Sequence, residues 1–149
     1  MSLDVYLRRK WYVQEQAGPR IFIREEGETK EISRAEWGAR FPDREPVTVE
    51  VEETDCVYGA NITHNLTKMA REAGLYEALW RPDEHGLTHA RQLVEPLRAG
   101  LARLWTDPAY FQTFNPENGW GNYDLLCRFV TGYLAACERW PAAEVSVSR

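Results

Sequence analysis

Apolar and polar residues alternate with a period of two at the start of the chain and again before its middle. Leu3, Val5 and Leu7 are separated by more polar residues, and three valines repeat this spacing over residues 47–51. Such alternation is typical of strands with one buried and one exposed face. The pattern therefore predicts a strand in each place.

Between these strands, the sequence predicts a hairpin followed by a short helix. Two apolar stretches flank Ala-Gly-Pro at residues 17–19, which is a turn-forming sequence. Ser33 and Glu36 have the spacing of a capping box, so we expect a short helix that ends before Pro42. The hairpin strands would be residues 11–16 and 20–24. We interpret residues 10–46 as a hairpin-plus-short-helix insert.

From Asn61 onward the apolar residues follow a helical period instead. Gly74 has the position of a helix C-cap, and Asp107 followed by Pro108 is typical of a helix start. Pro96 must kink or restart the helix that contains it. The predicted main helices are residues 62–73, 87–105 and 123–137, with shorter helical segments at 75–80 and 109–114. Residues 143–148 are expected to form a final strand.

This order of elements predicts an α+β fold. We expect a small, mostly antiparallel sheet, built from the N-terminal strands and the C-terminal strand, with three main helices packed on one face. The last strand would pair with the opening strand or with the one over residues 47–53. The 149 residues, 44% of them hydrophobic, suffice for a single domain over 1–149.

Charge and composition narrow the classes of partner. The formal net charge is −5, and the arginines are scattered, which argues against a nucleic-acid surface because such surfaces need a basic stripe. No apolar run is long enough to cross a membrane, and the opening residues lack the pattern of a signal peptide. We expect a cytoplasmic protein. The three cysteines have no Cys-x-x-Cys spacing and are interpreted as buried free thiols.

The first cluster of candidate site residues is Asn-Ile-Thr-His-Asn-Leu at residues 61–66. Asn61 is expected to be the N-cap of the helix that follows. His64 would then lie opposite the apolar stripe, where it could meet solvent, a second layer or an anion at the helix N-terminus. Thr63 borders the stripe, and Asn65 follows His64. The cluster either caps the helix or lines a polar pocket.

The second cluster is Asn-Pro-Glu-Asn-Gly-Trp-Gly-Asn at residues 115–122. Its glycines permit positive φ on either side of Trp120, so the indole is held in a defined place. The ring could plug the edge of the core or present a face on which a base, sugar or peptide stacks. Asn122 fits the N-cap of the last helix. The cluster's candidate site residues are Asn115, Asn118, Trp120 and Asn122.

Signals for catalysis and for metal binding are weak. His85 and His89 have the spacing of two ligands on one helix face, but no third ligand accompanies them. No nucleophile elbow or phosphate loop is present. His64 could act as a general base only if the fold brings a partner to it, and the candidates are Cys56, Asp124 and Glu117. We therefore expect no metal and no cofactor, and assign no catalytic residue.

The chain resembles an uncharacterised family of small proteins from bacteria and their phages. The matching motifs are Met-Ser-Leu-Asp-Val-Tyr-Leu at 1–7, Ala-Asn-Ile-Thr-His-Asn-Leu at 60–66 with Met69-Ala70, Ala-Gly-Leu-Tyr at 73–76, Leu-Trp-Arg-Pro at 79–82, Asn-Pro-Glu-Asn-Gly-Trp-Gly at 115–121, Tyr133-Leu134 and Val-Ser-Arg at 147–149. Residues from about 10 to 50 lie outside the resemblance and look like a variable insert. The resemblance implies no activity and no functional residue. It implies that both clusters belong to the common body.

The preferred hypothesis is a non-catalytic binding module whose two clusters meet in a small polar pocket. Amide groups fix the orientation of a ligand well but transfer protons poorly. Its partner would be a small polar ligand or a protein. The alternatives are a small enzyme that uses His64 as general base, and a phage or host protein-interaction factor with an apolar patch of Trp11, Phe22 or Trp37.

Overall fold

The computed structural model describes residues 1–16, 21–44, 46 and 48–149. The turn predicted at residues 17–19 and Val47 lie outside these, as do the side chains of Val49 and Val51. The chain divides into two compact units. Unit 1 comprises residues 1–10 and 54–149, and unit 2 comprises residues 11–53.

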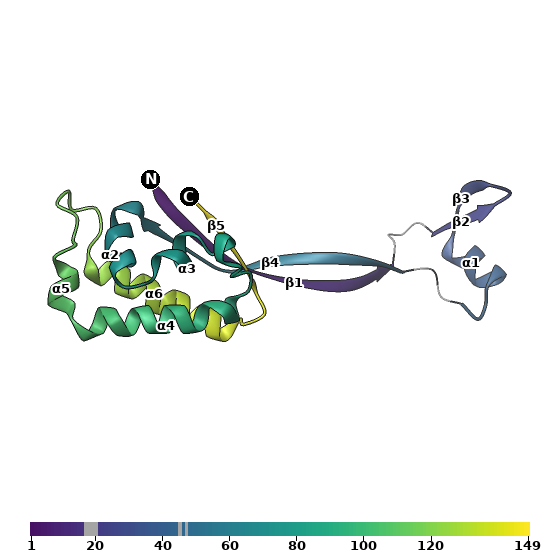
Figure 1. Cartoon of the computed structure of the whole chain (residues 1–149). Helices are drawn as coiled ribbons and strands as arrows, with labels where there is room; N and C mark the ends of the chain where they lie inside the picture. Colours follow the sequence, from purple (N-terminus) through teal and green to yellow (C-terminus); the bar gives the residue numbers. More distant parts are fainter. Residues whose placement is uncertain (17–20, 45, 47) are drawn as a thin grey trace. The chain divides into compact units, whose positions relative to one another are not determined.

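Unit 1 contains a three-stranded sheet with the order β4-β1-β5. The strands are β1 (Ser2–Gln16), β4 (Thr48–Thr63) and β5 (Glu144–Ser148), of which residues 11–16 and 48–53 belong to unit 2. β5 is antiparallel to β1, with Asp4 opposite Ser148 and Arg8 opposite Glu144. This pairing confirms the predicted return of the last strand to the opening one. The first and last strands meet near the two termini (Figure 1).

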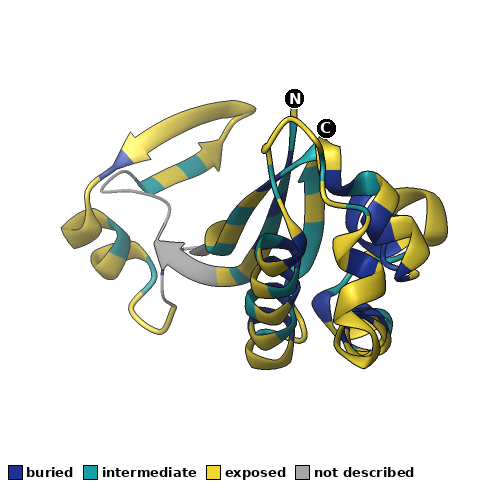
Figure 2. Ribbon diagram, turned by 90° about the vertical axis from the view of Figure 1, so that its left-hand side faces the viewer, coloured by how far each residue is buried: buried dark blue, intermediate teal, exposed yellow. Residues whose placement is uncertain are grey.

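The alternation in β1 places one of its faces in the core. Leu3, Val5 and Leu7 are completely buried, whereas Asp4 keeps part of its surface exposed and Arg8 is exposed. Buried residues gather where the helices meet the strands of unit 1 (Figure 2). The helices of unit 1 are η1 (His64–Leu66), α2 (Thr67–Glu72), α3 (Tyr76–Trp80), η2 (Asp83–His85), α4 (Ala90–Thr106), α5 (Pro108–Gln112) and α6 (Tyr123–Arg139). The α+β fold is confirmed.

Local signals set most of the helix ends as predicted. Gly74 has φ of +72°, its N–H donates to the Arg71 carbonyl, and the Leu75 N–H donates to the Ala70 carbonyl, which is a Schellman motif. Asp107 caps α5 through its bond from the Tyr110 N–H. Asn122 caps α6 in the same way. α4 runs through Pro96 without restarting and packs against α6.

The predicted start of the first main helix is wrong. β4 continues to Thr63, so Asn61 lies in a strand and is not a helix cap. Helical structure begins with the 3-10 turn η1, which Thr63 caps. The reason is long-range pairing, because the His64 N–H donates to the Met1 carbonyl at 3.3 Å and holds the end of β4 beside β1.

No helix in the described part of the chain combines the length and the apolar character needed to span a membrane.

Unit 2 contains a hairpin and one short helix. The hairpin joins β2 (Ile21–Glu25) to β3 (Glu28–Ile32), and a turn with positive φ at Glu26 and Gly27 connects them. The predicted pairing of residues 11–16 with 20–24 is therefore wrong, because residues 11–16 continue β1. The capping box of Ser33 and Glu36 is confirmed at the start of α1 (Arg34–Arg40).

The aromatic side chains of unit 2 differ in their exposure. Trp37 packs against Phe41 with ring centroids 4.6 Å apart, and its indole N–H donates to the Arg44 carbonyl at 2.8 Å. Trp11 is half-buried as well, whereas Phe22 is 54% exposed. Of the three residues suggested for an apolar patch, Phe22 is thus the most open to solvent.

Candidate ligand-binding site

The first cluster occupies the end of β4 and the turn that follows it. The Asn61 side-chain N–H donates to the Asp4 carboxylate at 2.7 Å across the sheet. Thr63 Oγ1 accepts from the Asn65 N–H at 3.3 Å, which closes the turn. Asn61 and Asn65 keep exposed side chains, while Thr63 and His64 are half-buried. The three successive polar side chains of Thr63, His64 and Asn65 therefore surround the point where the chain leaves the sheet.

His64 has the most constrained environment in this cluster. Its ring meets the buried Trp80 edge-on, with centroids 6.2 Å apart. Its Nε2 atom is buried and has no hydrogen-bond partner among the residues described by the structure. A buried polar atom without a partner costs free energy unless a ligand or water meets it. His64 is therefore a polar group that a ligand could satisfy.

The second cluster forms the loop between α5 and α6. Asn115 Oδ1 accepts from the Tyr123 N–H, and Asn122 Oδ1 accepts from the Leu125 N–H, both at 2.8 Å. These two amides hold the start of α6. Asn118 Oδ1 accepts from the Trp120 N–H at 2.9 Å and fixes the loop. The cluster thus divides into helix-capping residues and loop residues.

Trp120 points outward and is 71% exposed. Of the two alternatives for this ring, a plug at the edge of the core is therefore wrong, and a presented face fits the structure. Gly119 and Gly121 have φ of +73° and +99°, conformations that side chains rarely adopt. These glycines allow the chain to project the indole away from the core.

Gly121 also brings the two clusters together. A Cβ added there would lie 2.7 Å from Thr63 Cγ2 and 3.0 Å from Leu66 Cγ. The loop backbone therefore lies directly against the end of β4 and against η1. Only a residue without a side chain permits this approach.

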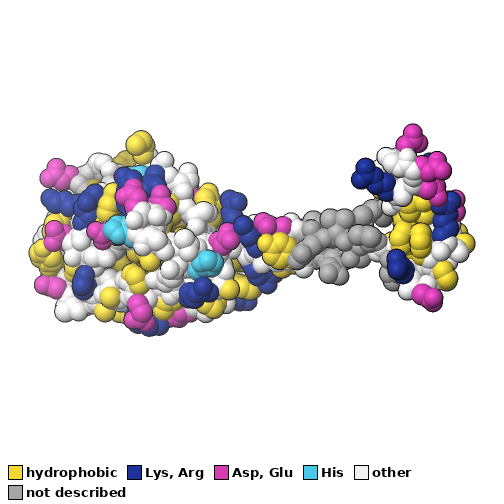
Figure 3. Space-filling model, turned by 45° about the vertical axis from the view of Figure 1, so that its right-hand side comes forward, with side chains coloured by type: hydrophobic (Ala, Val, Ile, Leu, Met, Phe, Trp, Pro, Cys, Tyr) yellow, Lys and Arg dark blue, Asp and Glu magenta, His cyan; other side chains and the backbone are white. Residues whose placement is uncertain are grey.

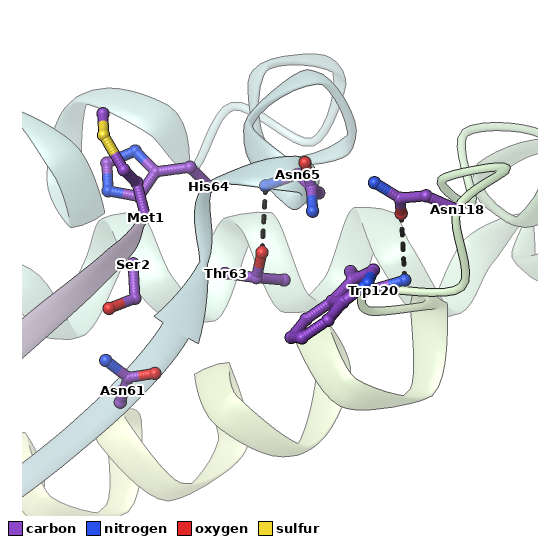
Figure 4. A pocket seen from close by; sticks show the side chains of 8 residues that line it. All are labelled: Met1, Ser2, Asn61, Thr63, His64, Asn65, Asn118 and Trp120. Carbon is purple, nitrogen blue, oxygen red and sulfur yellow. Dashed lines mark hydrogen bonds between the residues drawn. The ribbon is translucent and has the colours of Figure 1, made fainter.

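The two clusters line one pocket of about 600 Å³ (Figure 4). Six predicted site residues line it: Asn61, Thr63, His64, Asn65, Asn118 and Trp120. Asn115 and Asn122 are not among its lining residues and act as caps. Met1 and Ser2 complete the lining. No sequence signal pointed to these two, because only the pairing of β1 with β4 brings them to the site.

No Asp, Glu, Lys or Arg side chain is among these lining residues. Cys56, Asp124 and Glu117, the partners considered for a catalytic His64, are not among them either. Cys56 instead contacts the carbonyl of Tyr58, with its sulfur 3.3 Å from that oxygen. The pocket offers amides, hydroxyls, an imidazole and an indole, which suit hydrogen bonding and stacking better than proton transfer.

His85 and His89 do not share a helix face. His85 ends η2 and His89 is the N-cap of α4, with Gly86 in a left-handed conformation between them. Within the described residues, no group of three or more His, Cys, Asp or Glu side chains could hold a metal ion.

The cysteines are free, but their burial differs from the expectation. Cys137 is buried, Cys127 is half-buried and Cys56 is exposed. Burial raises the pKa of the Cys137 thiol to about 12, and the nearby Glu138 carboxylate adds to the shift. Cys137 is therefore a neutral core residue at physiological pH. The prediction of buried thiols is wrong for Cys56, because that residue lies on the exposed part of β4.

Comparisons of the chain with models of known protein families, with curated proteins and with solved structures found no match. The function therefore has to be inferred from the pocket itself.

Proposed function

We propose that unit 1 is a non-catalytic binding module for a small, polar, uncharged ligand. The observation that carries this proposal is the meeting of the two Asn-rich clusters at one pocket, with the open indole of Trp120 at its rim. Its volume of about 600 Å³ falls within the ~300–1,000 Å³ usual for small-molecule sites. We further propose that the module acts in the cytoplasm.

The charge of unit 1 supports an uncharged ligand. Unit 1 has twelve acidic and twelve basic side chains, whereas unit 2 has eleven and six, so the net charge of −5 belongs to unit 2. On the face of unit 1 seen in Figure 3, the two signs are interspersed. A polyanion such as a nucleic acid would need a basic stripe. No Asp, Glu, Lys or Arg side chain is among the residues that line the pocket.

Binding is favoured over catalysis by what surrounds His64. General-base catalysis needs a group within hydrogen-bond reach that orients or receives the proton. The side chains that line the pocket with His64 are amides, hydroxyls, a thioether and an indole. These groups orient a ligand through directed hydrogen bonds but do not exchange protons near neutral pH.

The test is a thermal-shift screen of small uncharged polar compounds, with variants that separate binding from folding. Trp120→Ala should leave the melting temperature of the free protein nearly unchanged, since its ring is 71% exposed, and should abolish the ligand-induced shift. Trp105→Ala is the matched control, because Trp105 is 59% exposed on α4 and does not line the pocket. If Trp120→Ala unfolds the protein, or both variants keep the ligand shift, the proposal is wrong.

A further inference from the structure

The backbone that carries Trp120 is fixed before any ligand arrives. The Trp120 backbone N–H is bound to Asn118 Oδ1, and the loop approaches η1 closely at Gly121. A tryptophan side chain has only two χ angles to order when a ligand covers it, so the entropy cost of stacking is low. The electron-rich face of an indole attracts groups with partial positive charge, including polarised C–H groups. The ring is therefore suited to a flat ligand surface made of such C–H groups.

The amides of the pocket are only partly used by the protein. Asn61 donates one N–H to Asp4, so its Oδ1 is left as an acceptor. Asn118 accepts from the Trp120 N–H, so its Nδ2 is left as a donor. The side chain of Asn65 has no hydrogen bond to another residue in the described part of the chain. Donors and acceptors are thus both available, and they come from a strand, a turn and a loop (Figure 4).

This combination disfavours several ligand classes. Phosphates and nucleotides are usually held by Lys or Arg side chains, and neither is among the residues that line the pocket. A carboxylate ligand would need them as well. A nucleobase could stack on Trp120, but the donors and acceptors on its edges all lie in the ring plane. The unused amides instead belong to separate elements and reach a ligand from different directions.

We infer that the ligand is a neutral carbohydrate. The C–H face of a pyranose ring stacks on the indole of Trp120, and the hydroxyls around its rim bond with Asn61, Asn65 and Asn118. Each sugar hydroxyl both donates and accepts, which matches an acceptor at Asn61 and a donor at Asn118. This inference rests on the proposed binding function and names the ligand class of the same pocket.

The experiment is an NMR titration of the whole ¹⁵N-labelled chain with maltotriose, cellotriose and triacetylchitotriose, and separately with adenosine and uridine. At least one trisaccharide should shift the Trp120 indole N–H and the side-chain amides of Asn65 and Asn118. Trp120→Ala should weaken that binding about tenfold or more, the effect of losing one aromatic stacking contact. Trp120→Tyr should retain most of the affinity, and Trp105→Ala should change nothing.

A second experiment distinguishes a chain-like glycan from a free sugar as the source of the carbohydrate. Insoluble cellulose and chitin are mixed with the protein, and the bound fraction is measured for the parent chain and for Trp120→Ala. Binding to the polymer beyond the trisaccharide affinity identifies a chain-like glycan, and binding to trisaccharides alone identifies a free sugar. Either result supports the inference.

The remaining outcomes overturn the inference in distinguishable ways. If a nucleoside shifts the pocket signals and no trisaccharide or polymer binds, the carbohydrate assignment is wrong and the binding function stands. If saccharides bind equally well to Trp120→Ala, they bind elsewhere. If neither these probes nor the thermal-shift compounds reach the pocket, both the inference and the proposed function fail.

Discussion

At the scale of single residues, two buried tyrosines differ in how their hydroxyls are satisfied. The Tyr123 hydroxyl donates to the Leu104 carbonyl at 2.8 Å, whereas the Tyr133 hydroxyl is buried with no partner among the described residues. Tyr123→Phe should lower the free energy of unfolding by about 1 kcal/mol, since it removes a hydrogen bond. Tyr133→Phe should leave it unchanged or raise it by up to ~1 kcal/mol, because no bond is lost. Urea denaturation at pH 7 measures both.

Tyr123 and Tyr133, together with Cys137, determine how the stability of the fold changes at alkaline pH. Burial raises the pKa of Tyr133 above the usual range of a phenol, and raises that of Tyr123 and Cys137 to about 12. In the unfolded chain these groups ionise near 10 for Tyr and 9 for Cys. Their contribution to stability is therefore present below about pH 9 and is lost as the pH rises toward 12. Tyr133→Phe should lose less stability between pH 8 and pH 11 than the parent chain. An equal or larger loss of stability in the variant would contradict the raised pKa of Tyr133.

At the scale of elements, the contact between the loop and η1 depends on Gly121. Gly121→Ala adds a methyl group against Thr63 and Leu66 at a position with φ of +99°. It should lower the free energy of unfolding by about 2–4 kcal/mol, from backbone strain and overpacking together. It should also move the Trp120 indole signal in NMR spectra, because the loop must shift away from η1.

Gly119→Ala is the matched control for this contact. Gly119 has φ of +73°, but a Cβ there would meet no atom within 4 Å. The variant should therefore show only the backbone cost of about 1–2 kcal/mol. Equal effects of the two substitutions would show that the close approach at Gly121 is not what holds the pocket together.

The elements that the sequence predicted well are those set by near neighbours. The capping box at Ser33, the C-cap at Gly74 and the N-caps at Asp107 and Asn122 each depend on residues within five positions. Such signals are readable without knowing the fold. Their success also explains why α1, α5 and α6 begin at the expected places.

The failures occurred where distant segments decide the structure. Asn61 has the chemistry of an N-cap, yet pairing with β1 extends β4 through it and transfers the cap to Thr63. The same pairing brings Met1 and Ser2 to the pocket, and nothing near them in sequence indicates it. The clusters were identifiable from composition, but which side chains face the pocket and which cap a helix was set by tertiary packing.

At the scale of the whole molecule, the residues of the main core all belong to unit 1. No residue from 11–53 is among the residues that form this core or line the pocket in the described part of the chain. β4 lies beside β1, with the His64 N–H bound to the Met1 carbonyl at one end and Arg9 3.5 Å from Asp55 in an ion pair at the other, so the two strands run in opposite directions. The chain positions that would have to be rejoined, Lys10 and Thr54, are therefore neighbours.

We accordingly expect unit 1 to fold without unit 2. Replacing residues 11–53 by Asn-Gly, which favours a two-residue hairpin turn, should give a cooperatively folding protein. Its net charge should be near zero, since unit 2 carries the excess of acids. Circular dichroism and urea denaturation measure folding, and the ¹⁵N titration compares the pocket of the shortened and full chains. Unchanged Trp120 and Asn118 signals would show that the pocket belongs to unit 1 alone. A shortened chain that stays unfolded would falsify the independent folding of unit 1. A shortened chain that folds but loses ligand binding would assign unit 2 a direct part in recognition.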